Sequence, residues 1–170
     1  GDWSSDVCSS DLAIGTNPGG GTLSGTTTVS AVAGVATFSN LSIDKSGVGY
    51  TLTAASGALT GATSSAFNIN PAAANRLAFT VQPTHTTAGV AIAPAVQVTV
   101  QDAFNNTVTS STASVTVAIG TNPGGGTLSG TTTVSAVSGV ATFSSTLSID
   151  KVGTGYTLTA ASGSLRSEEH

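Results

Sequence analysis

The chain has 170 residues, of which 39% are hydrophobic, 5% aromatic and only 7% charged, and its formal net charge is −4. With four Lys and Arg residues it has no basic stripe for nucleic acid and no polybasic patch for a membrane surface. It also has no run of about 18 apolar residues, so the sequence predicts no membrane-spanning helix.

The two ends of the chain differ in character from the rest. Asp2 to Leu12 reads DWSSDVCSSDL, and a set of codons that encodes it resembles a common sequencing adapter in translation. Arg166 to His170 reads RSEEH, which fits the reverse complement of the end of the same DNA word. We therefore expect residues 1–12 and 166–170 to be non-native additions, and we leave them out of the prediction of the fold.

This exclusion changes the chemistry that the chain can offer. Trp3 and Cys8 both lie in the excluded part, and without Cys8 neither a disulfide nor a thiolate zinc site can form. Apolar packing must then hold the fold together. Three acidic and three basic residues remain and bring the net charge to zero, namely Asp44, Asp102, Asp150, Lys45, Arg76 and Lys151.

An internal repeat dominates the remaining sequence. The 27 residues from Ala13 to Ser39 recur 105 residues later as Ala118 to Ser144, and the copies differ only where Ala33 becomes Ser138. A period near 100 residues with strand-like patterning is typical of a tandem array of β-sandwich modules.

Short segments in which apolar and polar residues alternate follow one another along each copy. Pro83 ends the first of them, a turn at Asp102–Asn106 follows the second, and a loop rich in Pro and Gly follows the third. Seven such strands predict an all-β fold, an immunoglobulin-like antiparallel β-sandwich. The expected strands centre on residues 77–81, 96–100, 115–119, 134–136, 141–143 and 156–160 of the second copy and on residues 67–69 of the first.

The copies are out of phase with the modules. We expect residues 13–71 to be the C-terminal part of one immunoglobulin-like repeat, and residues 72–165 to be a second repeat that lacks its last strand. The chain would then hold about one and a half modules. An open, uncharged strand edge invites strand addition. Ser64 to Ile69 is therefore a candidate to fill that edge, from the same chain or from a neighbour.

One inserted residue distinguishes the copies. Phe38 and Leu41 are three residues apart, whereas Phe143 and Leu147 are four apart. A continuous strand would place Phe143 and Leu147 on one face but Phe38 and Leu41 on opposite faces. If both copies bury both residues, a break or bulge must absorb the extra residue. We expect it near Asn40 and near Ser145–Thr146.

Four stretches carry a family resemblance: LAFTVQP, VTVQDAFNNTVT, GVATF and GYTLTAASG. They resemble bacterial immunoglobulin-like (Big-type) tandem repeats of large surface and adhesin-like proteins. In this resemblance Tyr50 and Tyr156 stand at the tyrosine corner of a sandwich, and Leu52 and Leu158 replace the cysteine of antibody domains.

The resemblance implies a structural spacer or stalk in an extracellular protein at a bacterial cell surface, with neighbouring repeats of the same chain as partners and no enzymatic activity. A host or cell-surface ligand stays unidentified. Two alternatives remain open, a carbohydrate- or receptor-binding module and an accessory domain of a secreted hydrolase. A sugar-binding module would need exposed aromatic residues, and Phe104 is the only aromatic residue in a predicted loop.

The glycine-rich loop from Gly120 to Gly130 is the most conspicuous candidate for a binding site. A phosphate-binding loop requires Lys where Gly126 stands, and a dinucleotide fingerprint requires Gly where Ser129 stands. We therefore interpret this loop as a plain connection between strands, and the sequence predicts no cofactor.

The remaining polar candidates are few. Asp102, Asn105 and Asn106 are weak calcium candidates because they offer hard oxygen ligands, and the other interpretation is a turn. The pairs Asp44–Lys45 and Asp150–Lys151 are expected to be solvated charges beside a turn, and His85 to be exposed after Pro83. No catalytic triad, acid pair or metal cluster can be assembled from these residues.

Overall fold

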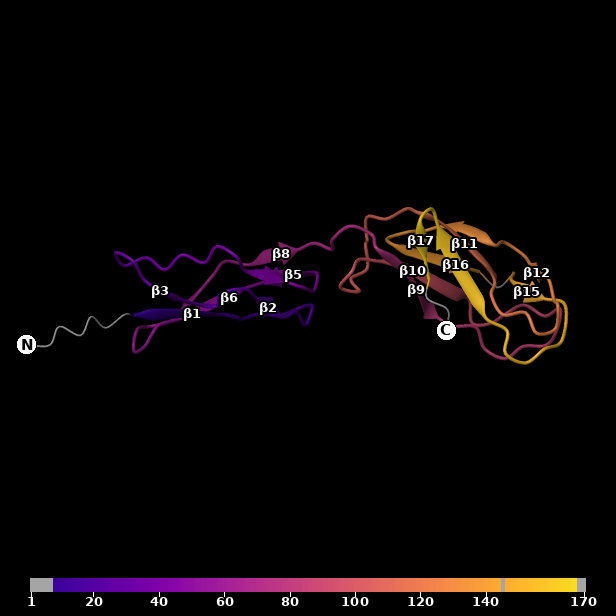
Figure 1. The fold of residues 1–170 in the computed structure, drawn as a ribbon, viewed down its shortest axis with the longest axis horizontal. Coiled ribbons are helices and arrows are strands. Elements are labelled where there is room, and N and C mark those ends of the chain that lie inside the picture. Colours follow the sequence, from indigo (N-terminus) through magenta and orange to yellow (C-terminus); the bar gives the residue numbers. More distant parts are fainter. Residues whose placement is uncertain (1–7, 145, 168–170) are drawn as a thin grey trace, which may run out of the picture. The chain divides into compact units, whose positions relative to one another are not determined.

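The computed structural model describes residues 8–144 and 146–167. In this part the chain is all-β, with 42% of residues in strands, no helix and several antiparallel sheets, an arrangement consistent with a β-sandwich. It divides into two compact units, Gly1–Asn70 (unit 1) and Pro71–His170 (unit 2) (Figure 1). The units meet one residue before the boundary expected from the sequence. Within the described residues no helix is long and apolar enough to cross a membrane.

Unit 1 contains a four-stranded sheet in the order β3-β1-β6-β7 and two separate pairs, β2-β4 and β5-β8. All of these pairings are antiparallel. The strands are β1 (Ser9–Ile14), β2 (Leu23–Ser24), β3 (Thr28–Ser30), β4 (Ser42–Ile43), β5 (Gly47–Tyr50), β6 (Leu52–Ala55), β7 (Ala62–Thr63) and β8 (Phe67–Ile69).

Strand β1 begins inside the segment that the sequence marks as adapter-like. Ser10 pairs with Val29, in the register in which Val115 pairs with Val134 in unit 2. Leu12 occupies the position equivalent to Val117. Leu12 and Ile14 point to the same side of β1, so one apolar face continues across the junction between Leu12 and Ala13. Excluding residues 9–12 from the fold was therefore wrong, whatever their origin, since a strand accepts any sequence with the right alternation.

Unit 2 contains two larger sheets, with strand orders β14-β10-β9 and β13-β11-β16-β17, and the pair β12-β15. Six of the seven predicted strands lie in this unit. The strands are β9 (Arg76–Val81), β10 (Val96–Gln101), β11 (Ser114–Ile119), β12 (Leu128–Ser129), β13 (Thr133–Ser135), β14 (Val140–Phe143), β15 (Ser148–Ile149), β16 (Leu158–Ser162) and β17 (Leu165–Arg166).

The core of unit 2 lies between its two larger sheets. Alternate residues of β10 and β11 are buried almost completely, with Val98 and Val115 both at 0% exposure. Residues from β9, β14 and β16 complete one continuous apolar cluster. Burying such side chains stabilises a fold by about 1.5–3 kcal/mol each, so this cluster is the principal source of stability in unit 2.

The break expected near Ser145–Thr146 falls between two strands of unit 2, and Ser145 itself lies outside the described residues. Strand β14 ends at Phe143 and β15 begins at Ser148, and both Phe143 and Leu147 are buried at 1% exposure. In unit 1 the expectation was wrong, because Phe38 and Leu41 are only half-buried. The described residues of unit 1 include no counterpart of the sheet formed by β9, β10 and β14, so nothing closes over these side chains.

The last strands of unit 2 differ from the prediction in two respects. The strand expected from Tyr156 to Ala160 begins only at Leu158, whereas Tyr50, the counterpart of Tyr156, lies in β5. Strand β17 includes Arg166, so excluding this residue from the fold was wrong. Strand β17 pairs with β16, and Ser167 then forms a parallel bridge with Leu77 of β9. The described part of unit 2 thus has no strand opposite Gly153–Tyr156.

Candidate functional site

The same tyrosine assembly occurs in both units. The hydroxyl of Tyr50 donates a hydrogen bond of 2.9 Å to the carbonyl oxygen of Lys45, and that of Tyr156 donates one of 3.1 Å to the carbonyl oxygen of Lys151. A tyrosine hydroxyl that bonds back to the backbone a few residues upstream is the defining feature of a tyrosine corner. Tyr50 and Tyr156 therefore both make the hydrogen bond to the backbone that is expected at this position.

The glycine-rich loop packs against this corner. A Cβ atom on Gly124 would collide with the Tyr156 hydroxyl oxygen and the carbonyl oxygen of Val152. A Cβ atom on Gly126 would lie 2.8 Å from the same hydroxyl and 2.7 Å from Cγ2 of Ile149. Glycine is required here because the loop backbone runs against the Tyr156 hydroxyl group.

Two polar side chains hold the loop in place. The Asn122 side chain accepts a hydrogen bond from the Gly126 amide and donates one to the Gly126 carbonyl, both of 2.8 Å. A carboxylate oxygen of Asp150 accepts a 2.6 Å bond from the Thr127 amide. Asn17 and Asp44 make the matching bonds in unit 1. These contacts explain the loop as a structural element, and they give Asp44 and Asp150 a backbone partner that the interpretation as solvated charges missed.

The turn at Asp102 is the most polar buried feature of unit 2. The Asp102 side chain is 0% exposed, and each of its two carboxylate oxygens accepts two hydrogen bonds of 2.9 Å. The donors are the amides of Ala72, Phe104 and Asn106 and the side-chain amide of Asn106. This one carboxylate therefore joins the start of unit 2 to the turn that follows β10.

These hydrogen bonds determine the ionisation of Asp102. Burial raises the pKa of its carboxyl group, but the bonds from Asn106, Ala72 and Phe104 outweigh burial and hold the pKa below the ordinary value of 3.8. Asp102 is therefore ionised at neutral pH and fully hydrogen-bonded, which is the condition under which a buried charge stabilises a fold.

The three calcium candidates divide in the structure. Asp102 and Asn106 lie together in a direct side-chain hydrogen bond, whereas Asn105 is exposed and has a left-handed backbone with φ of 67°. A cation at Asp102 would have to displace N–H donors from its oxygens, so the geometry matches the turn interpretation. Across residues 8–144 and 146–167, no three His, Cys, Asp or Glu side chains gather closely enough to hold a metal ion.

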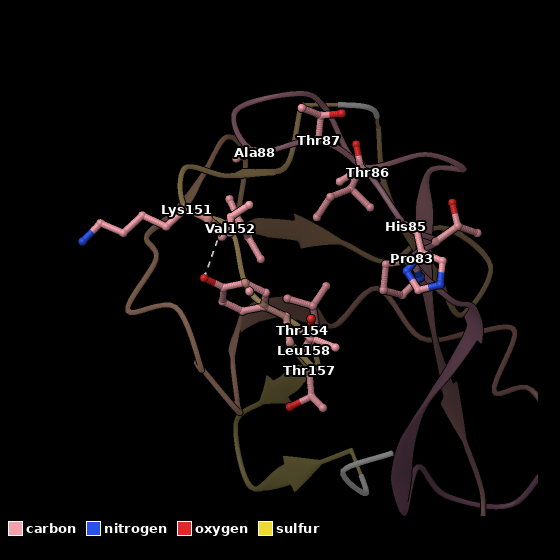
Figure 2. A pocket seen from close by; sticks show the side chains of 16 residues that line it. Pro83, His85, Thr86, Thr87, Ala88, Lys151, Val152, Thr154, Thr157 and Leu158 are labelled. Atoms are coloured by element: carbon pink, nitrogen blue, oxygen red, sulfur yellow. Dashed lines mark hydrogen bonds between the residues drawn. The ribbon is translucent and has the colours of Figure 1, made fainter.

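The exposed aromatic residue expected in this turn is present, since Phe104 is 52% exposed. His85 is also exposed, as predicted, and it lines a groove on unit 2 together with neighbouring residues. That groove has a volume of about 660 Å³. Figure 2 shows it bounded by the segment Pro83–Ala88 and by the segment Lys151–Leu158.

The sequence did not identify this groove as a site. Most of its lining residues are Thr, Gly or apolar residues that belong to no recognisable binding or catalytic motif. Among the lining residues, only Lys151 and His85 have side chains that can carry a positive charge. The available signal was the lack of a counterpart to Ser64–Ile69, which predicted an open edge but not a hollow beside it. Comparison with protein-family models, with curated proteins and with solved structures gives no match.

Proposed function

We propose that the chain is a segment of an extracellular bacterial repeat protein in which immunoglobulin-like modules serve as a structural spacer. The observation that carries this proposal is the use of the repeated residues. In both copies the recurring Asn, Gly and Asp residues hold a loop beneath a tyrosine corner. These residues, which are identical in the two copies, therefore have structural roles, as expected for an array of repeated structural modules.

A spacer between a cell and its surroundings is under tension, so its modules have to resist unfolding by force. Mechanical unfolding of the full chain tests the proposal. With handles at both ends, unit 2 should unfold in one cooperative event that releases on the order of 300 Å, from about 3.4 Å per extended residue. Unit 1 should stretch before it and at lower force, because its described apolar side chains other than Tyr50 are half-buried or exposed. A trace with no force peak attributable to unit 2 would rule out the spacer role.

Phe104 keeps one alternative function open to test. Its 52% exposure places an aromatic face in solvent at the end of a β-turn, where a sugar ring could stack. A carbohydrate- or receptor-binding module would show retention on a glycan array that the change Phe104→Ala abolishes. If the chain is a spacer, the wild type and the variant give the same background signal.

A further inference from the structure

The two units differ at one edge, and unit 1 shows what is missing from unit 2. In unit 1, β8 pairs antiparallel with β5, so that Gly47 lies opposite Ile69, Val48 opposite Asn68 and Tyr50 opposite Phe67. The counterpart of β5 in unit 2 is the segment Gly153–Tyr156, which has the same Gly-x-Gly-Tyr pattern. No strand in the described residues pairs with it.

The backbone of this segment is available for pairing. Within residues 8–144 and 146–167, the groups from Gly153 to Tyr156 make no backbone–backbone hydrogen bond. The residues from Lys151 to Gly155 are all exposed, and Val152 is 83% exposed. A strand edge with open N–H and C=O groups is a template for the backbone of another segment.

The groove beside this edge has an apolar floor where β8 has its side chains. In unit 1, Phe67 and Ile69 line one small pocket together with Ile43 and Leu52. The counterparts of these two partners, Ile149 and Leu158, line the 660 Å³ groove of unit 2. The hollow therefore lies over the surface that Phe67 and Ile69 contact in unit 1.

Tyr50 and Tyr156 differ in how far their rings are covered. Tyr50 is 0% exposed, and its ring is stacked on that of Phe67 with centroids 6.3 Å apart and an interplanar angle of 30°. Tyr156 makes the same hydrogen bond to the backbone but is only half-buried and lines the groove. Among residues 8–144 and 146–167, no aromatic ring stacks on Tyr156 as Phe67 stacks on Tyr50.

No described residue of unit 2 occupies this groove. The opposite wall, Pro83–Ala88, is exposed except at Pro83 and forms no strand (Figure 2). An occupant would thus be flanked by two exposed segments.

We propose that this groove is a strand-acceptor site for the segment Ser64–Ile69 of another copy of the repeat. The incoming strand pairs antiparallel with Gly153–Tyr156, places its Phe against Tyr156 and its Ile over Ile149, and completes the sheet edge. The register follows unit 1, so the positions equivalent to Asn68 and Ile69 lie opposite Thr154 and Gly153. This assignment does not depend on the spacer function.

A synthetic peptide of residues 61–70, GATSSAFNIN, is the probe. Labelled with fluorescein, it should bind the full chain saturably in fluorescence anisotropy. The peptide with Phe67→Ser and Ile69→Ser keeps the backbone but loses the side chains that fill the groove, so its affinity should fall more than tenfold. Hydrogen exchange at Gly153–Tyr156 should slow only with the first peptide.

The repeat provides a matched pair of variants for the acceptor. Ile149→Ala removes apolar surface from the groove and should weaken peptide binding at least threefold, whereas Ile43→Ala makes the same change in unit 1 and should leave binding unchanged. Circular dichroism establishes that each variant is folded. Equal binding of the two peptides, or equal effects of the two variants, would overturn the proposal.

A cross-link tests the register without weakening the fold. In a Cys8→Ser background with oxidised glutathione as the oxidant, the variant Thr154→Cys should form a disulfide with the peptide Asn68→Cys, because directly opposite residues bring their Cβ atoms within about 5.5 Å. The peptide Ser64→Cys places its thiol several residues away and should react at least fivefold more slowly. Equal rates for both peptides would refute this register, and no binding by the native peptide would refute the site.

Discussion

At the scale of single residues, the repeated loop shows why certain glycines recur. Gly124 and Gly126 carry no side chain because Tyr156 occupies the space in which a Cβ would lie. The sequence marks the loop by its glycine content and correctly rejects a phosphate site. It cannot show that the reason for the glycines is a ring about 30 residues further along the chain.

This packing makes a specific prediction for Gly124. The change Gly124→Ala forces a methyl group against the Tyr156 hydroxyl and the Val152 carbonyl, so we expect unit 2 to lose about 1–3 kcal/mol of unfolding free energy. Denaturant melts monitored by circular dichroism measure the loss. The neighbouring change Thr127→Ala lies at an exposed side chain and should stay within about 0.5 kcal/mol.

Asp102 leads to a prediction about pH. Its pKa in the folded state lies below the ordinary value of 3.8, so its contribution to stability is fully present above that value. The contribution is lost as the pH falls through the folded-state pKa, because the protonated carboxyl group can no longer accept all four hydrogen bonds.

The variant Asp102→Asn tests this assignment. It should lower the unfolding free energy at pH 7 by about 1–3 kcal/mol, since buried N–H donors lose a charged acceptor. It should also remove part of the loss of stability that the wild type shows below about pH 4. Melts at several pH values from 2 to 7 measure both effects, and parallel pH profiles for the two proteins would contradict the role given to Asp102.

At the scale of elements, identical sequence adopts different structure in the two units. In unit 2 the last four residues of GVATF form strand β14, in which Ala141 lies opposite Val98 of β10. In unit 1 the same five residues form no strand, and only the bridge between Val32 and Val35 remains. Propensity and alternation are equal in the two copies, so the partner strand decides the outcome.

Hydrogen exchange should separate the two copies of this segment. The amides of Val140–Phe143 should be protected because they pair with a buried strand, whereas those of residues 35–38 should exchange within seconds. Mass spectrometry distinguishes the peptides, because Ala33 and Ser138 give them different masses. Similar protection of both would mean that unit 1 closes over its apolar face in solution.

The same elements show how much of the fold can be predicted from the sequence. Alternation predicts β9, β10 and β11 within a residue or two, because these strands face the core on one side and their pattern has a period of two. It fails at Tyr156, where the residue has the right spacing but lacks the strand that would extend β16. The sequence-based prediction also fails at Ser9–Leu12, because these residues form part of β1 although they were left out of the fold as adapter-like.

At the scale of the whole molecule, the described residues form two units of unequal completeness. Unit 2 has a continuous core, while in unit 1 Tyr50 is the only large side chain that is fully buried among the described residues. Local stability follows buried apolar contact, so unit 1 should open at lower denaturant concentration. The groove follows the same difference. It lies in unit 2, where β8 of unit 1 has no counterpart among the described residues.

Limited proteolysis gives the corresponding prediction. A protease of broad specificity should cut first within unit 1, and a resistant fragment that begins near Pro71 should accumulate. Mass spectrometry of the fragments identifies the cut sites. Early cleavage within β10 or β11 would contradict the order of stability given by the burial of their valines.

The core of unit 2 has a further consequence for the chemistry that the protein can survive. It consists of Val, Leu, Ile, Ala and Phe, and the chain contains no Met. Its one thiol, Cys8, is exposed and lies in unit 1. Peroxide and hypochlorous acid attack sulfur first, and oxidised Met or Cys disrupts a core by becoming polar. Unit 2 offers these oxidants no sulfur, so it should keep its fold under an oxidative burst that inactivates sulfur-containing proteins around it.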